Sequence, residues 1–448
     1  MSRIELALAL LLATAPAFAD GPDTPDAATP EPETPAPEEE PEEQEEAKDP
    51  DRWFAVTGGT VHTVSGPVLP GVTVLAKNGR IVELGADVTV PQSAKVIDAA
   101  GMHVYPGLVA FDSTGLVGTP PEDSTDVFGL NLTLGLSAGI TTVRAGGAIA
   151  KLTYGTLDGH LLGKSPLTNV DYSTPNNRRA LRGYLEAVRE HGRQVRAAQL
   201  ARARGEDVKD PPGLKGKLAG YAKLLRRESK ALVSATTSRA LTEIAELALT
   251  YGFQVVVTGG EEAWLVAPVL GRAGVQVVVV PRARRWRDRW REAASGWSIE
   301  NAARLHAHGV QIAVMSQASG IGMGGLAGRD LLTLPLEAAF TVRGGLDPEA
   351  ALAAVTLGPA RVLGVDDQIG SLDVGKDCDL VIARGDLLHY ETLAEYTVVN
   401  GRVAYDKEQD SLLRHVRPRD LEGVNREIPQ LWPRGAGEPE PELPQEER

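Results

Sequence analysis

Two β-rich segments near the ends of the chain enclose a long region in which strand and helix patterns alternate, and this order restricts the fold more than any other feature. Short apolar runs with turn residues between them lie at 54–66, 72–85, 93–107, 378–386 and 396–406. Asn-Gly pairs at 78–79 and 400–401 interrupt two of these runs, as two-residue hairpin turns do. We therefore expect residues 53–105 and 370–410 to form one composite β-sandwich domain.

The enclosed region, residues 106–369, predicts a parallel sheet. Apolar strand patterns at 108–115, 138–147, 254–260, 275–281 and 310–320 alternate with helical patterns at 241–252, 261–274, 298–309, 335–345 and 347–364. Strands followed by helices imply right-handed crossovers, and several such units suit an α/β fold of the (β/α)8 TIM-barrel type. The stretch at about 175–230 is rich in Arg, Ala and Leu at helical spacing, which indicates a helical insertion in the barrel.

The acidity of the chain belongs to its ends. The chain has 448 residues, with 46 Lys and Arg against 60 Asp and Glu, a formal net charge of −14. Residues 20–51 contain 14 acids and one base, and residues 434–448 five acids and two bases, so residues 52–433 are left near neutral at +2. Nothing in this balance suits a protein that binds nucleic acid mainly through phosphate contacts. The Pro/Glu-rich composition predicts disorder over 20–52 and 434–448.

Residues 1–19 predict an export signal. Arg3 precedes an apolar run, and Ala17-Phe18-Ala19 fits a small-residue cleavage site, so we expect cleavage after Ala19 and a periplasmic or secreted protein. The rest of the sequence predicts no membrane span. The single cysteine, Cys378, excludes an intramolecular disulfide framework and Cys-rich metal sites, and we expect it to be buried.

Both ends of the 53–410 region resemble the amidohydrolase superfamily, imidazolonepropionase-like and related amidohydrolases in particular. The resemblance lies in GGTVHTVSG, KNGRIVELG and VIDAAGMHVYPGLVAFDSTG, and in GGLDPEAALAAVTLGPARVLGVDDQIGSLDVGKDCDLVIARGD at 344–386 followed by NGRVAYD. It implies a metal-dependent-hydrolase fold and, for activity, hydrolysis of carbon–nitrogen bonds other than peptide bonds.

The resemblance also implies a zinc site whose ligands this sequence does not repeat. The superfamily uses His-x-His after the first barrel strand, often a carboxylated lysine from the fourth, a histidine each from the fifth and sixth, and an aspartate from the eighth. The matching positions hold other residues: Asp112 and Thr114, Ala235, Thr258 or Gly259, and Ser316-Gln317. No other histidine falls where it could replace these ligands. The sequence therefore predicts no metal ligands and no cofactor.

Other polar residues follow barrel strands and are candidates for chemistry. Asp112, Glu261, Glu262 and Gln317 should gather where active groups of barrels lie, at the carboxyl ends of the strands. Asp112 and a glutamate could form a general acid/base pair if one pKa is raised, or hold a hard cation through oxygens. Alternatively, the two glutamates begin a helix, where acids are favoured, and Asp112 bonds to backbone.

Segment 281–297, PRARRWRDRWREAASGW, is rich in Arg and Trp. Arg284, Arg285 and Trp286, with Thr114 and Thr258, are our candidates for binding a small amide or carboxylate ligand, because guanidinium groups bind carboxylates bidentately. The segment could instead bind a partner or the acidic linker, or form an amphipathic helix with a solvated basic face.

Three hypotheses for function follow. The first is an amidohydrolase-superfamily protein, by resemblance a hydrolase of carbon–nitrogen bonds other than peptide bonds, that is catalytically degenerate because the metal ligands are lost. The second is a metal-independent or atypical-metal hydrolase that uses Asp112 and Glu261 or Glu262. The third is a ligand-binding protein or a regulatory partner of an active paralogue, and the sequence also leaves a homo-oligomer open.

Overall fold

The structure is a computed structural model that describes residues 51–290, 292–322 and 329–416. The predicted signal at 1–19, nearly all of the acidic segment at 20–52 and the tail at 434–448 lie outside these residues. The chain divides into residues 1–50 and 51–448, and only the second unit is described below. None of the described helices is both long enough and apolar enough to cross a membrane.

Strands from both ends of the described region form one eight-stranded sheet. Its order is β17-β16-β15-β5-β1-β2-β3, with β4 paired in parallel to β1. The strands are β1 (Trp53–His62), β2 (Val68–Lys77), β3 (Arg80–Gly85), β4 (Lys95–Asp98), β5 (His103–Pro106), β15 (Leu380–Ala383), β16 (Ala394–Val399) and β17 (Arg402–Asp406). β5 and β15 pair antiparallel, which joins the two ends of the sequence. Strands from 53–105 and 370–410 therefore lie in one hydrogen-bonded sheet, and their division into the two layers of a β-sandwich stays a prediction.

The two Asn-Gly hairpin turns predicted from the sequence contact each other. Asn78 and Gly79, and Asn400 and Gly401, all have positive φ, as the turn requires. A Cβ on Gly79 would lie 2.9 Å from the carbonyl oxygen of Asn400, so only glycine fits there. Cys378, fully buried as expected, bridges the turns: its N–H donates to Gly79 O and its carbonyl accepts from Gly401 N–H.

The alternating region builds two further sheets. One has the order β6-β7-β8-β9 and the other β10-β11-β12-β13-β14. Their strands are β6 (Leu108–Ala110), β7 (Ile140–Ala145), β8 (Ala148–Lys151), β9 (Leu161–Lys164), β10 (Leu167–Asn169), β11 (Lys230–Ala235), β12 (Val255–Gly259), β13 (Gln276–Val279) and β14 (Ile312–Val314). All neighbours are parallel except β7-β8 and β8-β9, an antiparallel addition that the sequence patterns did not predict.

Residues 354–355 connect the outer strands of these two sheets. The N–H of Val314 in β14 donates to Ala354 O, and the N–H of Val109 in β6 donates to Val355 O. Successive side chains along these strands point to opposite faces of the sheet, so they belong to two different hydrophobic clusters. Val109, Val256, Val278 and Ala313 pack with residues of α10 (Leu357–Leu363) in one cluster.

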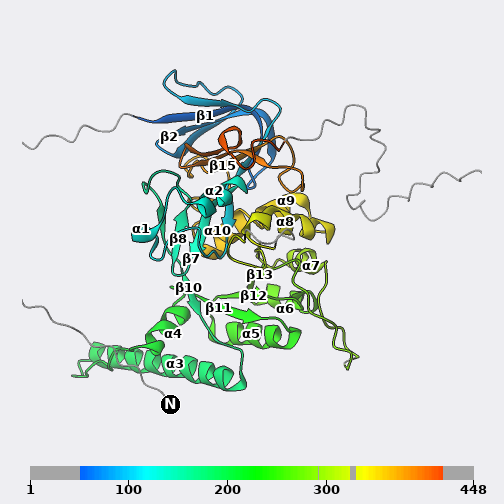
Figure 1. Ribbon diagram of the computed structural model, residues 1–448. Coiled ribbons are helices and arrows are strands. Elements are labelled where there is room, and N and C mark those ends of the chain that lie inside the picture. The colour runs from blue at the N-terminus through cyan, green and yellow to red at the C-terminus, as the bar shows by residue number, and fades with distance from the viewer. Residues whose placement is uncertain (1–50, 291, 323–328, 417–448) are drawn as a thin grey trace, which may run out of the picture. The chain divides into compact units, whose positions relative to one another are not determined.

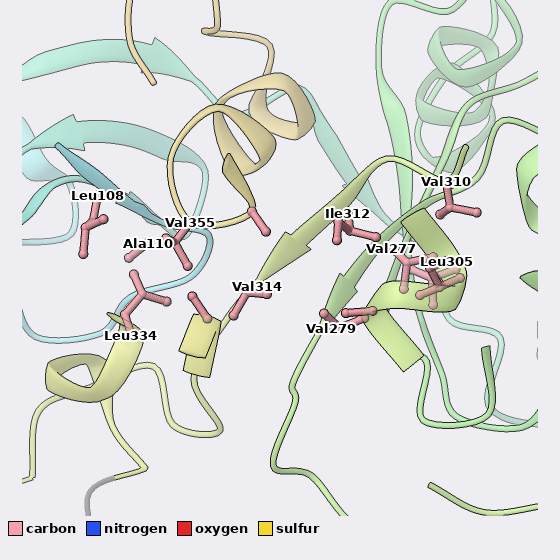
Figure 2. Close-up of a cluster of buried hydrophobic side chains, with 14 of the residues drawn as sticks. Leu108, Ala110, Val277, Val279, Leu305, Val310, Ile312, Val314, Leu334 and Val355 are labelled. Atoms are coloured by element: carbon pink, nitrogen blue, oxygen red, sulfur yellow. The ribbon is translucent and has the colours of Figure 1, made fainter. Parts of the chain in front are cut away.

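The alternate residues face the helices. Figure 2 shows Val277, Val279, Ile312 and Val314 of β13 and β14 packed with Leu305 of α7 and neighbouring side chains.

The helices are α1 (Pro121–Ser124), α2 (Leu130–Ser137), α3 (Pro175–Ala203), α4 (Lys217–Leu225), α5 (Ser238–Tyr251), α6 (Ala267–Arg272), α7 (Asn301–Ala307), α8 (Leu334–Arg343), α9 (Pro348–Ala353) and α10, with short 3₁₀ turns η1 (Ala263–Leu265), η2 (Leu331–Thr333) and η3 (Lys407–Gln409). In Figure 1, α5 and α6 lie along the β10–β14 sheet.

Some predicted helices differ from the observed ones. The predicted insertion at about 175–230 forms the packed pair α3 and α4. The helical pattern at 261–274 is split into η1 and α6, with Pro268 in the first turn of α6, and that at 347–364 is split into α9 and α10. Segment 281–297 contains no helix in its described residues, so the amphipathic-helix alternative is wrong. Its side chains are used in tertiary contacts instead.

Candidate functional site

The first barrel strand ends in a carboxylate that is paired with a buried arginine. Asp112 follows β6, and its Oδ1 lies 3.0 Å from an Arg144 guanidinium nitrogen of the adjacent strand β7. Arg144 stacks over the Phe111 ring, with its guanidinium carbon 5.3 Å from the ring centroid. Its side chain is 10% exposed and that of Asp112 40%, so the pair opens to solvent on the carboxylate side.

This pair is not saturated with hydrogen bonds. The buried Nε of Arg144 donates to no acceptor among the described residues. Burial raises the pKa of Asp112 above its ordinary value, and the charge of Arg144 and the Ser113 N–H only partly offset this. A buried guanidinium therefore lies beside a carboxylate that is half exposed, and the carboxylate is the part of this pair that solvent reaches.

Thr114 and Gln317, two other predicted residues, lie on contacting segments. The N–H of Thr114 donates to Ser319 O at 2.7 Å, which joins the chain after β6 to the chain after β14. Gln317 is exposed, and its Oε1 accepts a hydrogen bond from Arg329 at 2.6 Å. Asp112, Thr114 and Gln317 therefore belong to one region at the carboxyl ends of β6 and β14.

Glu262 lies in a different place and is fully used in structural contacts. Its side chain is buried, and its two oxygens accept hydrogen bonds from Ser238 N and Oγ, Gly296 N and Arg285 Nε, the last at 2.9 Å. Burial alone would raise the pKa of Glu262, but these donors lower it below its ordinary value. The carboxylate thus holds the N-terminus of α5, where negative charge is favoured, together with segment 281–297.

The adjacent Glu261 has the opposite environment. Its Oε2 is buried and accepts no hydrogen bond among the described residues. Burial raises the pKa of Glu261, and the negative charge of Glu262 acts in the same direction, while its own backbone N–H and Arg285 act against it. The pKa values of the two successive glutamates therefore shift in opposite directions, because four donors surround the Glu262 carboxylate and Oε2 of Glu261 has none among the described residues. No hydrogen bond or ion pair in the described part of the chain joins Asp112 to either glutamate.

Segment 281–297 is fixed at its base and exposed at its tip. Arg282 pairs with Glu337, which is completely buried, at 2.8 Å. Trp297 donates to Pro281 O, and Trp264 donates to Gly296 O. Trp286 and Trp290, in contrast, are 83% and 97% exposed.

Of the predicted ligand-binding residues in this segment, Arg285 is held by Glu262 and Arg284 lies over the Trp297 ring, 5.9 Å from its centroid. Thr258 is partly buried in β12 and aligned with Val278 of β13.

The structure therefore separates the predicted residues into two groups, Asp112 with Thr114 and Gln317, and the glutamates with Arg285. Sequence reasoning missed Arg144, although a lone arginine in the apolar run AGITTVRAGG was a usable signal. It also missed Glu337, which no pattern marks.

The donor set does not fit the zinc site that the resemblance implies. Zinc needs three or four nitrogen, oxygen or sulfur ligands at one point. Where the first two histidines would stand, Asp112 faces a permanent cation and Thr114 bonds to Ser319. Within 51–290, 292–322 and 329–416, no three His, Cys, Asp or Glu side chains gather as metal ligands.

Comparisons with known proteins identify the fold. The family model described as the amidohydrolase family matches residues 283–408, from segment 281–297 to β17. An amidohydrolase from Thermotoga maritima MSB8 aligns with a TM-score of 0.63 and 22% identity, over 79% of this chain and all of the other. The chain has the amidohydrolase-superfamily fold. Phenylurea hydrolase B aligns with a TM-score of 0.50 and 16% identity, over 78% of this chain and 96% of the other. No curated protein matches the sequence.

The predicted resemblance and fold class are thus confirmed: an amidohydrolase-type barrel with a composite β domain. At the carboxyl ends of β6 and β14 the chain presents an Asp112–Arg144 ion pair and a Gln317–Arg329 hydrogen bond.

Proposed function

We propose that this protein binds a small amide or carboxylate ligand at the Asp112–Arg144 pair, without the superfamily's metal-dependent turnover. The fold is that of hydrolases that act on carbon–nitrogen bonds other than peptide bonds, and this supports a ligand of the amide class. The proposal rests mainly on the guanidinium of Arg144, which lies beside Asp112 at a first-strand position where the resemblance implies a metal cation.

The pair is complementary to an amide. The half-exposed carboxylate of Asp112 can accept an amide N–H, and the guanidinium beside it supplies the positive charge that a carbonyl or carboxylate oxygen of the ligand needs. Because Arg144 is buried, its hydrogen bonds form in a poorly hydrated environment, where they are stronger than in water.

Thermal-shift and calorimetric titrations with cyclic amides and N-acyl amino acids test this proposal. We expect at least one of these compounds to stabilise the protein, Arg144→Leu to abolish that stabilisation, and no hydrolysis above the blank with or without added Zn²⁺. Zinc-dependent turnover, or stoichiometric zinc that survives dialysis, would overturn it. A complete absence of ligand-induced stabilisation would also overturn it.

A metal-independent hydrolase is the second candidate, because burial raises the pKa of both Asp112 and Glu261 and a protonated carboxyl can act as a general acid. Glu262, with its lowered pKa and four donors, does not suit that role. Turnover that is insensitive to chelators and is lost in either Asp112→Asn or Glu261→Gln, tested singly because the two carboxyls lie in separate groups, would favour this candidate over the first.

A further inference from the structure

The strongest positive charge in the chain lies on the helical insertion, away from the Asp112–Arg144 site. Residues 175–228 contain 14 basic and six acidic residues, a net charge of +8, whereas residues 52–433 as a whole carry only +2. The region comprises α3 and α4, which pack against each other. Its charge is therefore concentrated on one helical pair instead of being spread over the surface.

A cavity of ≈ 610 Å³ lies between these helices. Arg189, Arg193, Arg196 and Arg226 line it, together with His191 and an apolar floor that includes Val188, Leu214 and Leu225. Three of these arginines pair with nearby carboxylates, Arg189 with Glu186, Arg193 with Glu190 and Arg226 with Glu228, but no acidic residue of the described chain lines the cavity. We call this cavity the α3–α4 groove.

The ion pairs of the groove arginines are exposed. Arg193 pairs with Glu190 at 2.8 Å, Arg189 lies 3.6 Å from Glu186 and over the Tyr251 ring, and Arg226 forms a bidentate pair with Glu228. Exposed pairs of this kind contribute little stability. In the part of the chain that the structure describes, Arg196 makes no ion pair. A carboxylate-bearing ligand could therefore replace these pairs at small cost.

We propose that the α3–α4 groove binds an extended, acidic, proline-containing polypeptide. Guanidinium groups bind carboxylates in a bidentate manner, and prolines keep a chain extended before it binds, so less entropy is lost on binding. The apolar side chains line a concave groove instead of projecting outward, which suits proline and alanine side chains better than it suits insertion into a lipid surface. Residues 20–51 of this protein are a sequence of that chemistry and supply the probe.

The test is a fluorescence-anisotropy titration of a labelled peptide with the sequence of residues 20–51. The full chain is used, with the glutamates between 38 and 46 replaced by Gln so that they do not compete with the probe. We expect saturable binding that weakens as salt rises, and no binding of a peptide with Gln and Asn in place of Glu and Asp. The double variant Arg193→Glu/Arg196→Glu should weaken binding by about tenfold or more.

Two matched controls separate the groove from general charge. Arg272→Glu/Arg343→Glu makes the same charge change at exposed positions elsewhere and should leave affinity within about twofold after screening by salt. Gly192 lines the groove and a Cβ there meets nothing within 4 Å, so Gly192→Leu should obstruct the groove without altering charge, while it favours the helix as any Gly→Leu change in α3 does. Gly183→Leu, on the same helix with equally open space, is its control.

The proposal is overturned if both charge reversals weaken binding equally, or if Gly192→Leu binds as well as Gly183→Leu. It is also overturned if vesicles of anionic phospholipid or a DNA duplex bind through the groove while the peptide does not. Circular dichroism of each variant confirms that loss of binding is not loss of folding.

Discussion

Arg144 and Lys151 are buried cations on adjacent strands of one sheet, yet their partners differ. Lys151 is 1% exposed, and its Nζ lies 2.7 Å from Asp377 Oδ2, 2.9 Å from Asp379 Oδ2 and 2.5 Å from Asn400 Oδ1. Arg144 has one carboxylate partner, Asp112, which is 40% exposed, and keeps an unused donor. Lys151 joins β8 to the composite β domain, whereas Arg144 faces the strand ends. The two cations therefore differ in what surrounds them: Lys151 links two domains from a fully buried position, whereas the ion pair of Arg144 reaches solvent through its carboxylate.

Removal of the Lys151 charge should cost the most stability. Lys151→Met leaves the buried Asp379 without its cation and Asp377 with only the exposed Arg80, which should lower the free energy of unfolding by about 3–5 kcal/mol. Urea denaturation measures this, with the exposed Lys164→Met as control. A loss below about 1 kcal/mol would show that the cluster is not what joins the domains.

Glu262→Gln should have the next largest effect. Gln keeps the shape but loses the negative charge to which Ser238, Gly296 and Arg285 donate, so we expect a loss of about 2–3 kcal/mol in the same denaturation experiment. Increased proteolysis within 281–297 should accompany it. If the variant is as stable as the wild type, the carboxylate is not what fixes this segment.

Arg144→Leu should cost less, about 1–2 kcal/mol, because the Asp112 carboxylate left behind is half exposed and can be hydrated. The same variant should lose all ligand-induced stabilisation. A stability loss as large as that of Lys151→Met would mean that Arg144 is structural and would remove the distinction between the two buried cations.

The smallest effect is the pH dependence of Glu261→Gln. Burial holds the pKa of Glu261 above its ordinary value near 4.5, so folding opposes its ionisation at neutral pH. Gln should therefore stabilise the protein slightly at pH 7, by less than about 1 kcal/mol, and the gain should vanish as the pH falls below that ordinary value.

Glu262→Gln is the matched comparison. The pKa of Glu262 lies below its ordinary value, so the cost of this substitution is complete above that value and shrinks as the pH falls through the lowered pKa. Denaturation between pH 3 and 7 measures both variants. Equal pH dependence of the two would contradict the difference in their environments.

Much of the fold could be predicted because its signals are local. The hairpin turns at Asn78-Gly79 and Asn400-Gly401 need positive φ, and the alternation of strand and helix patterns specifies parallel units. Patterns failed where tertiary contacts override them. Arginines spaced along 281–297 suggested a helix, but Arg282 and Arg285 are held by Glu337 and Glu262, and the segment follows those contacts.

The candidate site shows the same division. Which groups can bind a metal follows from residue identity, so the sequence alone predicts that Asp112, Thr114 and Gln317 do not form a zinc site. The contacts come from the tertiary structure: Arg144 faces Asp112, four donors surround the Glu262 carboxylate, and Oε2 of the neighbouring Glu261 accepts no hydrogen bond among the described residues. The physical reason is that a charge takes its role from the donors, acceptors and water around it, and elements distant in the chain bring these together.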